Sequence, residues 1–276
     1  MLRSLLFAPA SDEHKLWKAL ASAADAVVAD LEDATAPDKK EAARGIVETV
    51  FGDAEARSAR VLRVNAPGSE WFEGDLELAD RLELDLLMLP KATPLTVAAL
   101  GPAGPPVLAI VESAEGLRLA YETAAAERVF ALALGTHDLG AELRTSARSD
   151  GLEILYARSK VVADSAAAGR GQPFDTVYRD VRDSAGLEDE CLLASTLGFG
   201  GKLCIHPGQL EVVNRVFAPS EAELELARRV LEAYEQGLHE GRGAVELDGK
   251  MIDMPIVRQA ERLLGKARAT SESDSE

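Results

Sequence analysis

The sequence predicts an α/β fold, namely a closed (β/α)8 barrel followed by a C-terminal helical extension. Short apolar runs alternate with longer amphipathic stretches, the pattern of parallel strands that crossover helices cover on both faces. Eight such runs suit a closed barrel, and a single barrel of roughly 250 residues is common, so a chain of 276 residues has room for one barrel and an appendage. We therefore assign residues 1–218 to the barrel and residues 219–268 to the extension.

The expected strands and helices alternate along the chain. The strands are 5–8, 26–31, 61–64, 84–89, 107–111, 129–134, 176–178 and 203–205. The seventh run is polar and could equally be a loop. The helices are 12–23, 39–50, 72–81, 114–125, 152–168 and 188–197, and each is rich in residues of high helix propensity.

The C-terminal segment begins with a capping box, because Ser220 stands three residues before Glu223 and an apolar-periodic stretch follows. A glycine-punctuated stretch at 237–249 leads into a second helical pattern at 251–268. The remaining residues, 269–276, are mostly polar, and we expect them to form a disordered tail.

The composition excludes several classes of partner. A formal net charge of −17 makes nucleic acid and anionic membrane surfaces poor general partners. No apolar run reaches the roughly 20 residues that span a bilayer. The two cysteines, Cys191 and Cys204, lack metal-binding spacing, so we expect buried thiols in a reducing, cytoplasmic compartment.

Two carboxylates follow neighbouring predicted strands. The catalytic groups of a parallel barrel project from the C-terminal strand ends, where Glu112 and Asp138 stand. Their carboxylates could converge on a hard cation such as Mg²⁺. Each could equally cap the helix that follows it, so the residues alone leave metal binding and helix capping open.

Two cations also follow predicted strands. Arg63 can bind a carboxylate with its planar fork, and Lys91 can add a second positive charge. The alternative for Arg63 is a structural ion pair with the cluster of Asp30, Glu32 and Asp33. Both interpretations remain open at this level.

Two histidines stand at predicted strand ends as well. We interpret His206, which precedes Pro207, as a hydrogen-bonded packing residue. His137 stands beside Asp138 and could touch the site, but we expect it to face away.

Several motifs at the strand ends resemble those of a known family. They are Arg3-Ser4-Leu5-Leu6-Phe7-Ala8-Pro9, Asp30-Leu31-Glu32-Asp33-Ala34, Arg63-Val64-Asn65, Leu89-Pro90-Lys91, Glu112, Gly135-Thr136-His137-Asp138-Leu139 and Gly201-Lys202-Leu203-Cys204-Ile205-His206-Pro207-Gly208-Gln209. Together they resemble the citrate lyase β-subunit family, whose relatives include the malyl-CoA and citramalyl-CoA lyases of the HpcH/HpaI aldolase superfamily. The resemblance extends from Arg3 to about Leu264, and the order of the motifs makes it specific.

The resemblance implies a TIM barrel in which Glu112 and Asp138 bind Mg²⁺, with Mn²⁺ as an alternative. It implies that Arg63 holds the carboxylate and carbonyl groups of the substrate, with Lys91 and Glu112 as further substrate-binding residues. It also implies that Asp30 and Glu32 lie directly behind the metal ligands.

The segment 249–255 resembles the C-terminal motif of the same family. The resemblance implies that Asp253 reaches the active site of a neighbouring subunit and acts there as acid and base. The extension would then pack on that subunit in a homotrimer or hexamer. From the residues alone, Asp253 could instead cap a helix, because Pro255 favours the first helical turn.

Two departures from the family pattern stand out. Family members often carry an acidic residue where this chain has His137, which could alter the choice of substrate. They often carry a basic residue in the turn that here contains Asp12, Glu13 and His14, so a contact from that turn to a CoA phosphate is in doubt.

The implied reaction is the cleavage or formation of a 3-hydroxyacyl-CoA thioester such as malyl-CoA or citramalyl-CoA, with acetyl-CoA and a 2-oxo acid on the other side. Two alternatives remain open: a citrate lyase β-subunit that acts on a citryl group carried by an acyl carrier protein, and a non-catalytic acyl-CoA-binding module. The joint presence of Arg63, Glu112, Asp138 and Asp253 favours an enzyme. The acyl group stays open, because pocket volume decides it.

Overall fold

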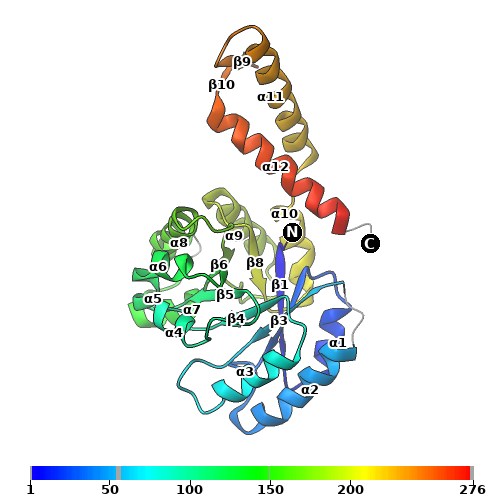
Figure 1. The fold of residues 1–276 in the computed structure, drawn as a ribbon, viewed down its shortest axis with the longest axis vertical. Helices are drawn as coiled ribbons and strands as arrows, with labels where there is room; N and C mark the ends of the chain where they lie inside the picture. Colours follow the sequence, from blue (N-terminus) through cyan, green and yellow to red (C-terminus); the bar gives the residue numbers. More distant parts are fainter. Residues whose placement is uncertain (1, 54–56, 149, 274–276) are drawn as a thin grey trace. The chain divides into compact units, whose positions relative to one another are not determined.

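The computed structural model describes residues 2–53, 57–148 and 150–273. The chain forms two compact units, one spanning Leu2–Phe217 and one that begins at Ala218 (Figure 1). The first unit is a barrel of parallel strands and helices, and the second is a helical hairpin with a small antiparallel sheet.

The eight barrel strands pair in chain order, and the pairing of β1 with β8 closes the ring. Their bounds are β1 Ser4–Pro9, β2 Ala26–Asp30, β3 Ala59–Arg63, β4 Leu86–Leu89, β5 Val107–Val111, β6 Val129–Leu134, β7 Phe174–Asp175 and β8 Gly201–Cys204. The predicted TIM barrel is therefore confirmed. The register places Asp30 of β2 opposite Arg63 of β3, at the C-terminal ends of both strands.

The barrel helices lie outside the ring of strands (Figure 1). They are α1 Glu13–Leu20, α2 Lys40–Asp53, α3 Phe72–Arg81, α4 Pro94–Ala98, α5 Ala114–Arg118, α6 Ala120–Ala125, α7 Thr136–Leu143, α8 Leu155–Ala167, α9 Ser184–Leu197 and α10 Leu210–Phe217, with three short 3₁₀ turns at Pro37–Lys39, Leu152–Ile154 and Pro207–Gln209. The helix predicted at 114–125 is two helices, because the backbone at Leu119 leaves the helical region.

The predicted seventh strand at 176–178 is wrong by two residues, since β7 is Phe174–Asp175. Asp175 is fully buried and forms ion pairs with Arg158 at 2.9 Å and with Lys202 at 2.8 Å. A strand whose buried residue is charged has no apolar signature, so its polar sequence resembles a loop. The polar residues that follow it therefore belong to the loop at the C-terminal end of the barrel.

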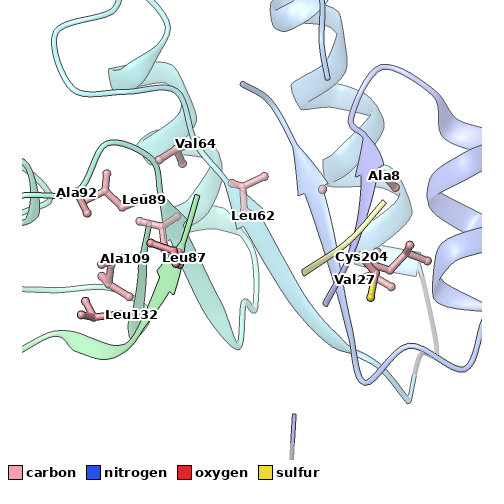
Figure 2. Close-up of a cluster of buried hydrophobic side chains, with 14 of the residues drawn as sticks. Ala8, Val27, Leu62, Val64, Leu87, Leu89, Ala92, Ala109, Leu132 and Cys204 are labelled. Carbon is pink, nitrogen blue, oxygen red and sulfur yellow. The ribbon is translucent and has the colours of Figure 1, made fainter. Parts of the chain in front are cut away.

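Apolar side chains form two layers, one inside the barrel and one between the strands and the helices, because successive residues of a strand point to opposite faces. Ala26 and Val28 of β2 point into the barrel, whereas Val27 and Ala29 pack under the helices. Figure 2 shows part of this outer layer, with Ala8, Val27, Leu62, Val64, Leu87, Leu89, Ala92, Ala109, Leu132 and Cys204 labelled. Both cysteines are buried and free, as predicted, and burial raises the pKa of each thiol to about 12.

The C-terminal unit contains α11 Glu221–His239, β9 Val245–Leu247, β10 Lys250–Ile252 and α12 Met254–Ser273. The capping box of Ser220 with Glu223 is present, as predicted. The hairpin was not expected, although its turn, Asp248-Gly249, is a strong hairpin signal and both residues have positive φ, at 51° and 75°. The helices α11 and α12 pack side by side through apolar residues such as Val230 and Val257 (Figure 1).

The helix α12 passes through residues 269–273, which the sequence assigns to a disordered tail. The remainder of that predicted tail, 274–276, lies outside the described residues. Among the helices described, none is both long and apolar enough to cross a membrane.

Candidate active site

A cavity of about 390 Å³ opens at the C-terminal ends of the barrel strands. Four of the predicted site residues line it: Asp30, Arg63, Glu112 and Asp138. They come from the ends of β2, β3, β5 and the start of α7, which follows β6. The other lining residues are Phe7, Asp33, Ala34, Ile110, Gly135, His137, Thr176, Val177, Arg179, Leu203 and Ile205.

Arg63 forms a two-pronged ion pair with Asp30. Its Nε donates to Oδ1 at 2.7 Å and its Nη2 donates to Oδ2 at 2.6 Å. The third nitrogen, Nη1, lies 3.0 Å from Oε2 of Glu32 and 3.7 Å from Oδ2 of Asp33. Burial by itself would lower the pKa of Arg63, but these carboxylates outweigh burial and raise it. The guanidinium is thus charged and held in one orientation by the acidic cluster.

Asp30 also shapes the loop after β2. Its Oδ1 accepts from the backbone N–H of Glu32 at 2.9 Å and its Oδ2 from that of Ala34 at 3.1 Å. Lys40, buried below the loop, donates from Nζ to the carbonyls of Leu31 at 2.7 Å and Glu32 at 2.8 Å. The loop is therefore fixed by side chains on both of its sides.

The carboxylate of Glu112 is buried and held by backbone. Its Oε1 accepts from the N–H of Lys91 at 2.8 Å, and Lys91 adopts the left-handed conformation with a φ of 49°. Burial, with a smaller contribution from the charge of Asp138, raises the pKa of Glu112 to about 7 against the opposing effects of Arg63 and Lys91. A non-glycine residue at positive φ stores strain, which clusters at functional sites.

Glu32 is a second carboxyl whose charge is poorly compensated. Burial, with smaller effects of Asp33 and Glu112, raises its pKa to about 7 despite the proximity of Arg63. Its Oε2 is buried and accepts no hydrogen bond within the described residues, although Nη1 of Arg63 is 3.0 Å away. Carboxylates that repel one another in a buried cavity favour the binding of a cation.

The residues at this cavity fit a divalent metal ion. Glu112 and Asp138 line the same space, Asp138 is exposed to it, and the two carboxylates repel. Across the described part of the chain, no three His, Cys, Asp or Glu side chains are grouped closely enough to form a metal site by themselves. Mg²⁺ needs only one or two carboxylates and takes its remaining ligands from water and substrate. The metal-ligand assignment of Glu112 and Asp138 stays a prediction.

Three predicted site residues are not among those that line the cavity: Glu32, described above, Lys91 and Asp253. The Lys91 side chain is half exposed, with Nζ 3.7 Å from Oε1 of Glu32, so its contribution here is the backbone N–H that holds Glu112. Asp253 lies in the C-terminal unit, between β10 and α12, and its carbonyl accepts from the N–H of Val257 at 3.0 Å. The predicted catalytic role of Asp253 stays a prediction.

The structure agrees with the prediction for His206 and contradicts the prediction for His137. His206 accepts from the N–H of Gly208 at 3.0 Å through Nδ1 and caps the turn Pro207–Gln209, which agrees with a packing role. His137 lines the cavity, so the expectation that it faces away from the site is wrong. Residue 137 lies in the first turn of α7, a helix that the sequence did not predict.

The sequence does not single out three lining residues of the loop after β7: Thr176, Val177 and Arg179. The misplaced seventh strand conceals Thr176 and Val177, because a strand at 176–178 would hold both in the barrel wall. One sequence signal could have corrected the position of the strand. A buried cation can pair with Asp175, so Phe174-Asp175 can form the strand and the residues after it the loop. Thr176 in turn joins this loop to α7, since its Oγ1 accepts from the N–H of Thr136 at 3.2 Å.

Comparison with known proteins identifies the family of this chain. The family model described as HpcH/HpaI aldolase/citrate lyase matches residues 3–98 and 103–207, and that of a C-C bond lyase of the TIM-barrel fold matches residues 165–271. A (3S)-malyl-CoA thioesterase of Cereibacter sphaeroides is 39% identical over 272 residues, which are 97% of this chain and 95% of the relative. The citrate lyase subunit beta of Escherichia coli is 35% identical over 285 residues, covering 96% and 93%.

Solved structures of citrate lyase β-subunit proteins are also similar to this chain. The protein CitE of Mycobacterium tuberculosis, in complex with magnesium, acetoacetate and coenzyme A, has a TM-score of 0.83 at 36% identity, covering 97% of this chain and 98% of that one. The citrate lyase beta subunit of M. tuberculosis complexed with oxaloacetate and magnesium has a TM-score of 0.71 at 36% identity, covering 79% and 97%. This chain belongs to the HpcH/HpaI aldolase/citrate lyase family.

Proposed function

We propose that this protein is a Mg²⁺-dependent carbon–carbon lyase that cleaves a 3-hydroxyacyl-CoA thioester, such as malyl-CoA or citramalyl-CoA, into acetyl-CoA and a 2-oxo acid. The observation that carries the proposal is the cavity in which two mutually repelling carboxylates, Glu112 and Asp138, lie with the fixed guanidinium of Arg63. The relatives of known structure that bind magnesium, coenzyme A and small acids support it.

Glu112 and Asp138 would hold the metal ion. When bound, Mg²⁺ would supply Lewis-acid polarisation of the substrate oxygen at the carbon where the bond breaks. The strained backbone at Lys91 presets the Glu112 carboxylate through its N–H, so the ligand does not have to reorganise when the cation enters.

Arg63 would bind the carboxylate of the 2-oxo-acid half. Its Nε and Nη2 are engaged by Asp30, whereas Nη1 contacts Glu32 without forming a hydrogen bond. Nη1 is therefore the nitrogen that keeps the capacity to donate to a ligand. Asp30 fixes the orientation of the fork, and a group positioned before the reaction stabilises developing charge best.

Cleavage breaks the carbon–carbon bond between the hydroxyl-bearing carbon and the methylene next to the thioester. The hydroxyl loses its proton to water and becomes the carbonyl of the 2-oxo acid, while the bonding electron pair remains on the acetyl thioester as its enolate. We assign Asp253 of a neighbouring subunit, in a homotrimer or hexamer, as the group that returns a proton to this enolate carbon. In the reverse direction the same carboxylate would take a proton from the acetyl methyl group.

A second candidate is hydrolysis of the thioester, because the relative that is 39% identical is named a malyl-CoA thioesterase. A third is action on a citryl thioester of an acyl carrier protein, which the similarity to citrate lyase β-subunits favours. The three reactions release different products from the same class of substrate.

One assay separates them. Purified protein with Mg²⁺ is incubated with malyl-, citramalyl- and citryl-CoA and with citryl-acyl carrier protein, and 2-oxo acid and free thiol are measured in parallel. We expect 2-oxo acid from a CoA thioester without free thiol, and loss of the product after chelation of Mg²⁺. Free thiol with a hydroxy acid would establish hydrolysis, and turnover of the carrier-protein substrate alone would establish the citrate lyase role.

A matched pair of variants controls the assay. Glu112→Gln should abolish turnover, whereas Glu115→Gln, which changes an exposed residue three positions on, should leave it intact. Tight acyl-CoA binding without any turnover would reject catalysis and indicate a binding module.

A further inference from the structure

The two arginines of the cavity differ in how their charge is used. All the charge of Arg63 is opposed by protein carboxylates, since Asp30 takes two of its nitrogens and Glu32 and Asp33 lie near the third. Arg179 also lines the cavity, but it forms no ion pair and no hydrogen bond with any residue that the structure describes. Arg179 is therefore the arginine of the cavity whose charge no carboxylate of the described residues pairs with.

The position of Arg179 is distinct from that of Arg63. Arg63 ends β3, and Arg179 follows β7, which is four strands away in a closed ring of eight. Strands four apart stand on opposite sides of such a barrel. The predicted metal ligands, Glu112 and Asp138, come from β5 and the start of α7, between the two arginines in the strand order. A ligand held at those carboxylates would thus have one arginine on each side.

The backbone that carries Arg179 is anchored on both sides. The carbonyl of Tyr178 accepts from Nε2 of Gln209 at 2.7 Å, and its hydroxyl donates to Asp183 at 2.6 Å. Asp183 then caps α9 by accepting from the N–H of Gly186 at 2.9 Å. A fixed loop presents the side chain to the cavity, which lowers the entropy lost when a ligand binds.

The negative charge around the cavity makes the unpaired arginine important for binding an anionic ligand. The chain carries a net charge of −17, and several of the carboxylates line the same cavity. An anionic substrate needs a local positive charge to overcome this repulsion. The effect of Arg179 is felt within the cavity, because after burial it is the next largest cause that lowers the pKa of His137.

We propose that Arg179 is a specificity-determining residue that binds a second carboxylate, carried on the 2-oxo-acid half of the substrate. The proposal rests on the lyase function proposed above and extends its substrates from malyl-CoA and citramalyl-CoA, whose acyl groups bear one free carboxylate, to hydroxyacyl thioesters whose acyl group bears two. Arg63 binds one carboxylate and Arg179 the other. The phosphates of CoA are the competing anions, but the whole pantetheine arm separates them from the thioester, which reacts beside Glu112 and Asp138.

Direct binding of 2-oxo acids tests the proposal without turnover. Isothermal titration calorimetry with saturating Mg²⁺ compares freshly prepared oxaloacetate, which has two carboxylates, with pyruvate, which has one. For Arg179→Gln we expect oxaloacetate binding to weaken by about 10- to 100-fold, the value of a charge-assisted hydrogen bond, and pyruvate binding to change by less than about threefold. Arg179→Lys, which keeps the charge but loses the fork, should fall between wild type and Arg179→Gln.

Arg182→Gln is the matched control, because it removes the same charge from an exposed arginine of the same loop that does not line the cavity. It should bind both acids as the wild type does. Equal weakening of both acids by Arg179→Gln would overturn the proposal, and so would weaker binding of free CoA with oxaloacetate unchanged. A panel of thioesters that the wild type does not cleave would reject the lyase function, yet the calorimetry would still decide the role of Arg179.

Discussion

Gly135 lies so close to Glu112 that the carboxylate occupies the space of a missing side chain. A Cβ added to Gly135 would stand 2.7 Å from the Cβ of Glu112 and 2.8 Å from its Oε2. The φ of Gly135 is −106°, which any residue can adopt. The glycine is therefore required by the close approach of the carboxylate and by nothing in its own backbone.

Gly135→Ala should displace the Glu112 carboxylate from its hydrogen bond with Lys91. Both the neighbouring Cβ and the Cγ2 of Ile110, at 3.2 Å, belong to a buried strand end that cannot move freely. We expect a loss of about 1–3 kcal/mol in the free energy of unfolding, typical of overpacking, and at least about tenfold weaker Mg²⁺ binding. Urea unfolding and calorimetric Mg²⁺ titration measure the two effects.

Gly45→Ala provides the control for the added methyl group. Gly45 lies in α2, is exposed and has no atom within 4 Å of its added Cβ. The same substitution there should stabilise the protein by about 0.5–1 kcal/mol, because alanine favours the helix, and leave Mg²⁺ binding unchanged. Unaltered Mg²⁺ affinity in Gly135→Ala would show that Glu112 tolerates displacement or is no ligand.

The raised pKa of Glu112 predicts a pH dependence of stability. With a pKa of about 7 in the folded chain against an ordinary 4.5, the folded state binds more protons than the unfolded state between these values. Ionisation of Glu112 therefore weakens the fold as pH rises through this window, in the absence of metal. The wild type should lose on the order of 2 kcal/mol relative to Glu112→Gln between pH 5 and pH 8.

Urea unfolding of both proteins in a chelating buffer at several pH values measures this difference. Glu115→Gln, at an exposed position, should parallel the wild type at every pH. Added Mg²⁺ should restore the wild type at high pH and leave Glu112→Gln unchanged, since the cation neutralises the ionised carboxylate. A pH-independent difference between wild type and Glu112→Gln would contradict the raised pKa.

The barrel could be predicted from sequence because most of its strands are apolar on both faces. β2, for example, is the run Ala26–Asp30, buried at every position. The position of β7 was predicted wrongly because its buried Asp175 is neutralised by Arg158 and Lys202. These two residues are distant from it in sequence and adjacent only after folding. Charge compensation between remote residues leaves no local pattern.

Contacts between residues that are remote in sequence also limited the prediction of the site. Strand-end position was enough to find Arg63, Glu112 and Asp138, all of which line the cavity. Whether Arg63 is free or engaged depended on its register with Asp30, which only the closed ring sets. Arg179 directly follows the strand predicted at 176–178, so the same strand-end rule could have found it, and the hairpin turn at Asp248 was another local signal that could have been used.

Lys40→Met should destabilise the loop that carries Glu32. The buried ammonium of Lys40 donates to the carbonyls of Leu31 and Glu32 and to Oδ1 of Asn65. Methionine fills similar space but donates to none of these acceptors, and Oδ1 of Asn65 then has no donor among the described residues, so we expect a loss of about 2–3 kcal/mol and reduced turnover. Lys39→Met, at the exposed neighbouring position, should stay within about 0.5 kcal/mol of wild type. Equal stability of the two variants in urea would contradict this role of Lys40.

Asp253→Asn should separate acid–base chemistry from folding. Asp253 is half-buried between β10 and α12, and asparagine keeps its size and can still precede the helix. We expect an unchanged melting temperature and Mg²⁺ affinity with about 10²- to 10⁴-fold slower turnover, the usual contribution of a general acid or base. Asp248→Asn, at the exposed hairpin turn of the same unit, should turn over as wild type does.

Mixing two inactive variants tests from which subunit Asp253 acts. If it completes the site of a neighbour, subunits of Asp253→Asn mixed with subunits of Glu112→Gln form some sites in which both residues are intact. Turnover of the mixture should then rise after denaturation and joint refolding, well above the residual turnover of either variant refolded alone. Loss of turnover in Asp253→Asn with no recovery on mixing would place its action within its own subunit, and full turnover of that variant would remove it from the mechanism.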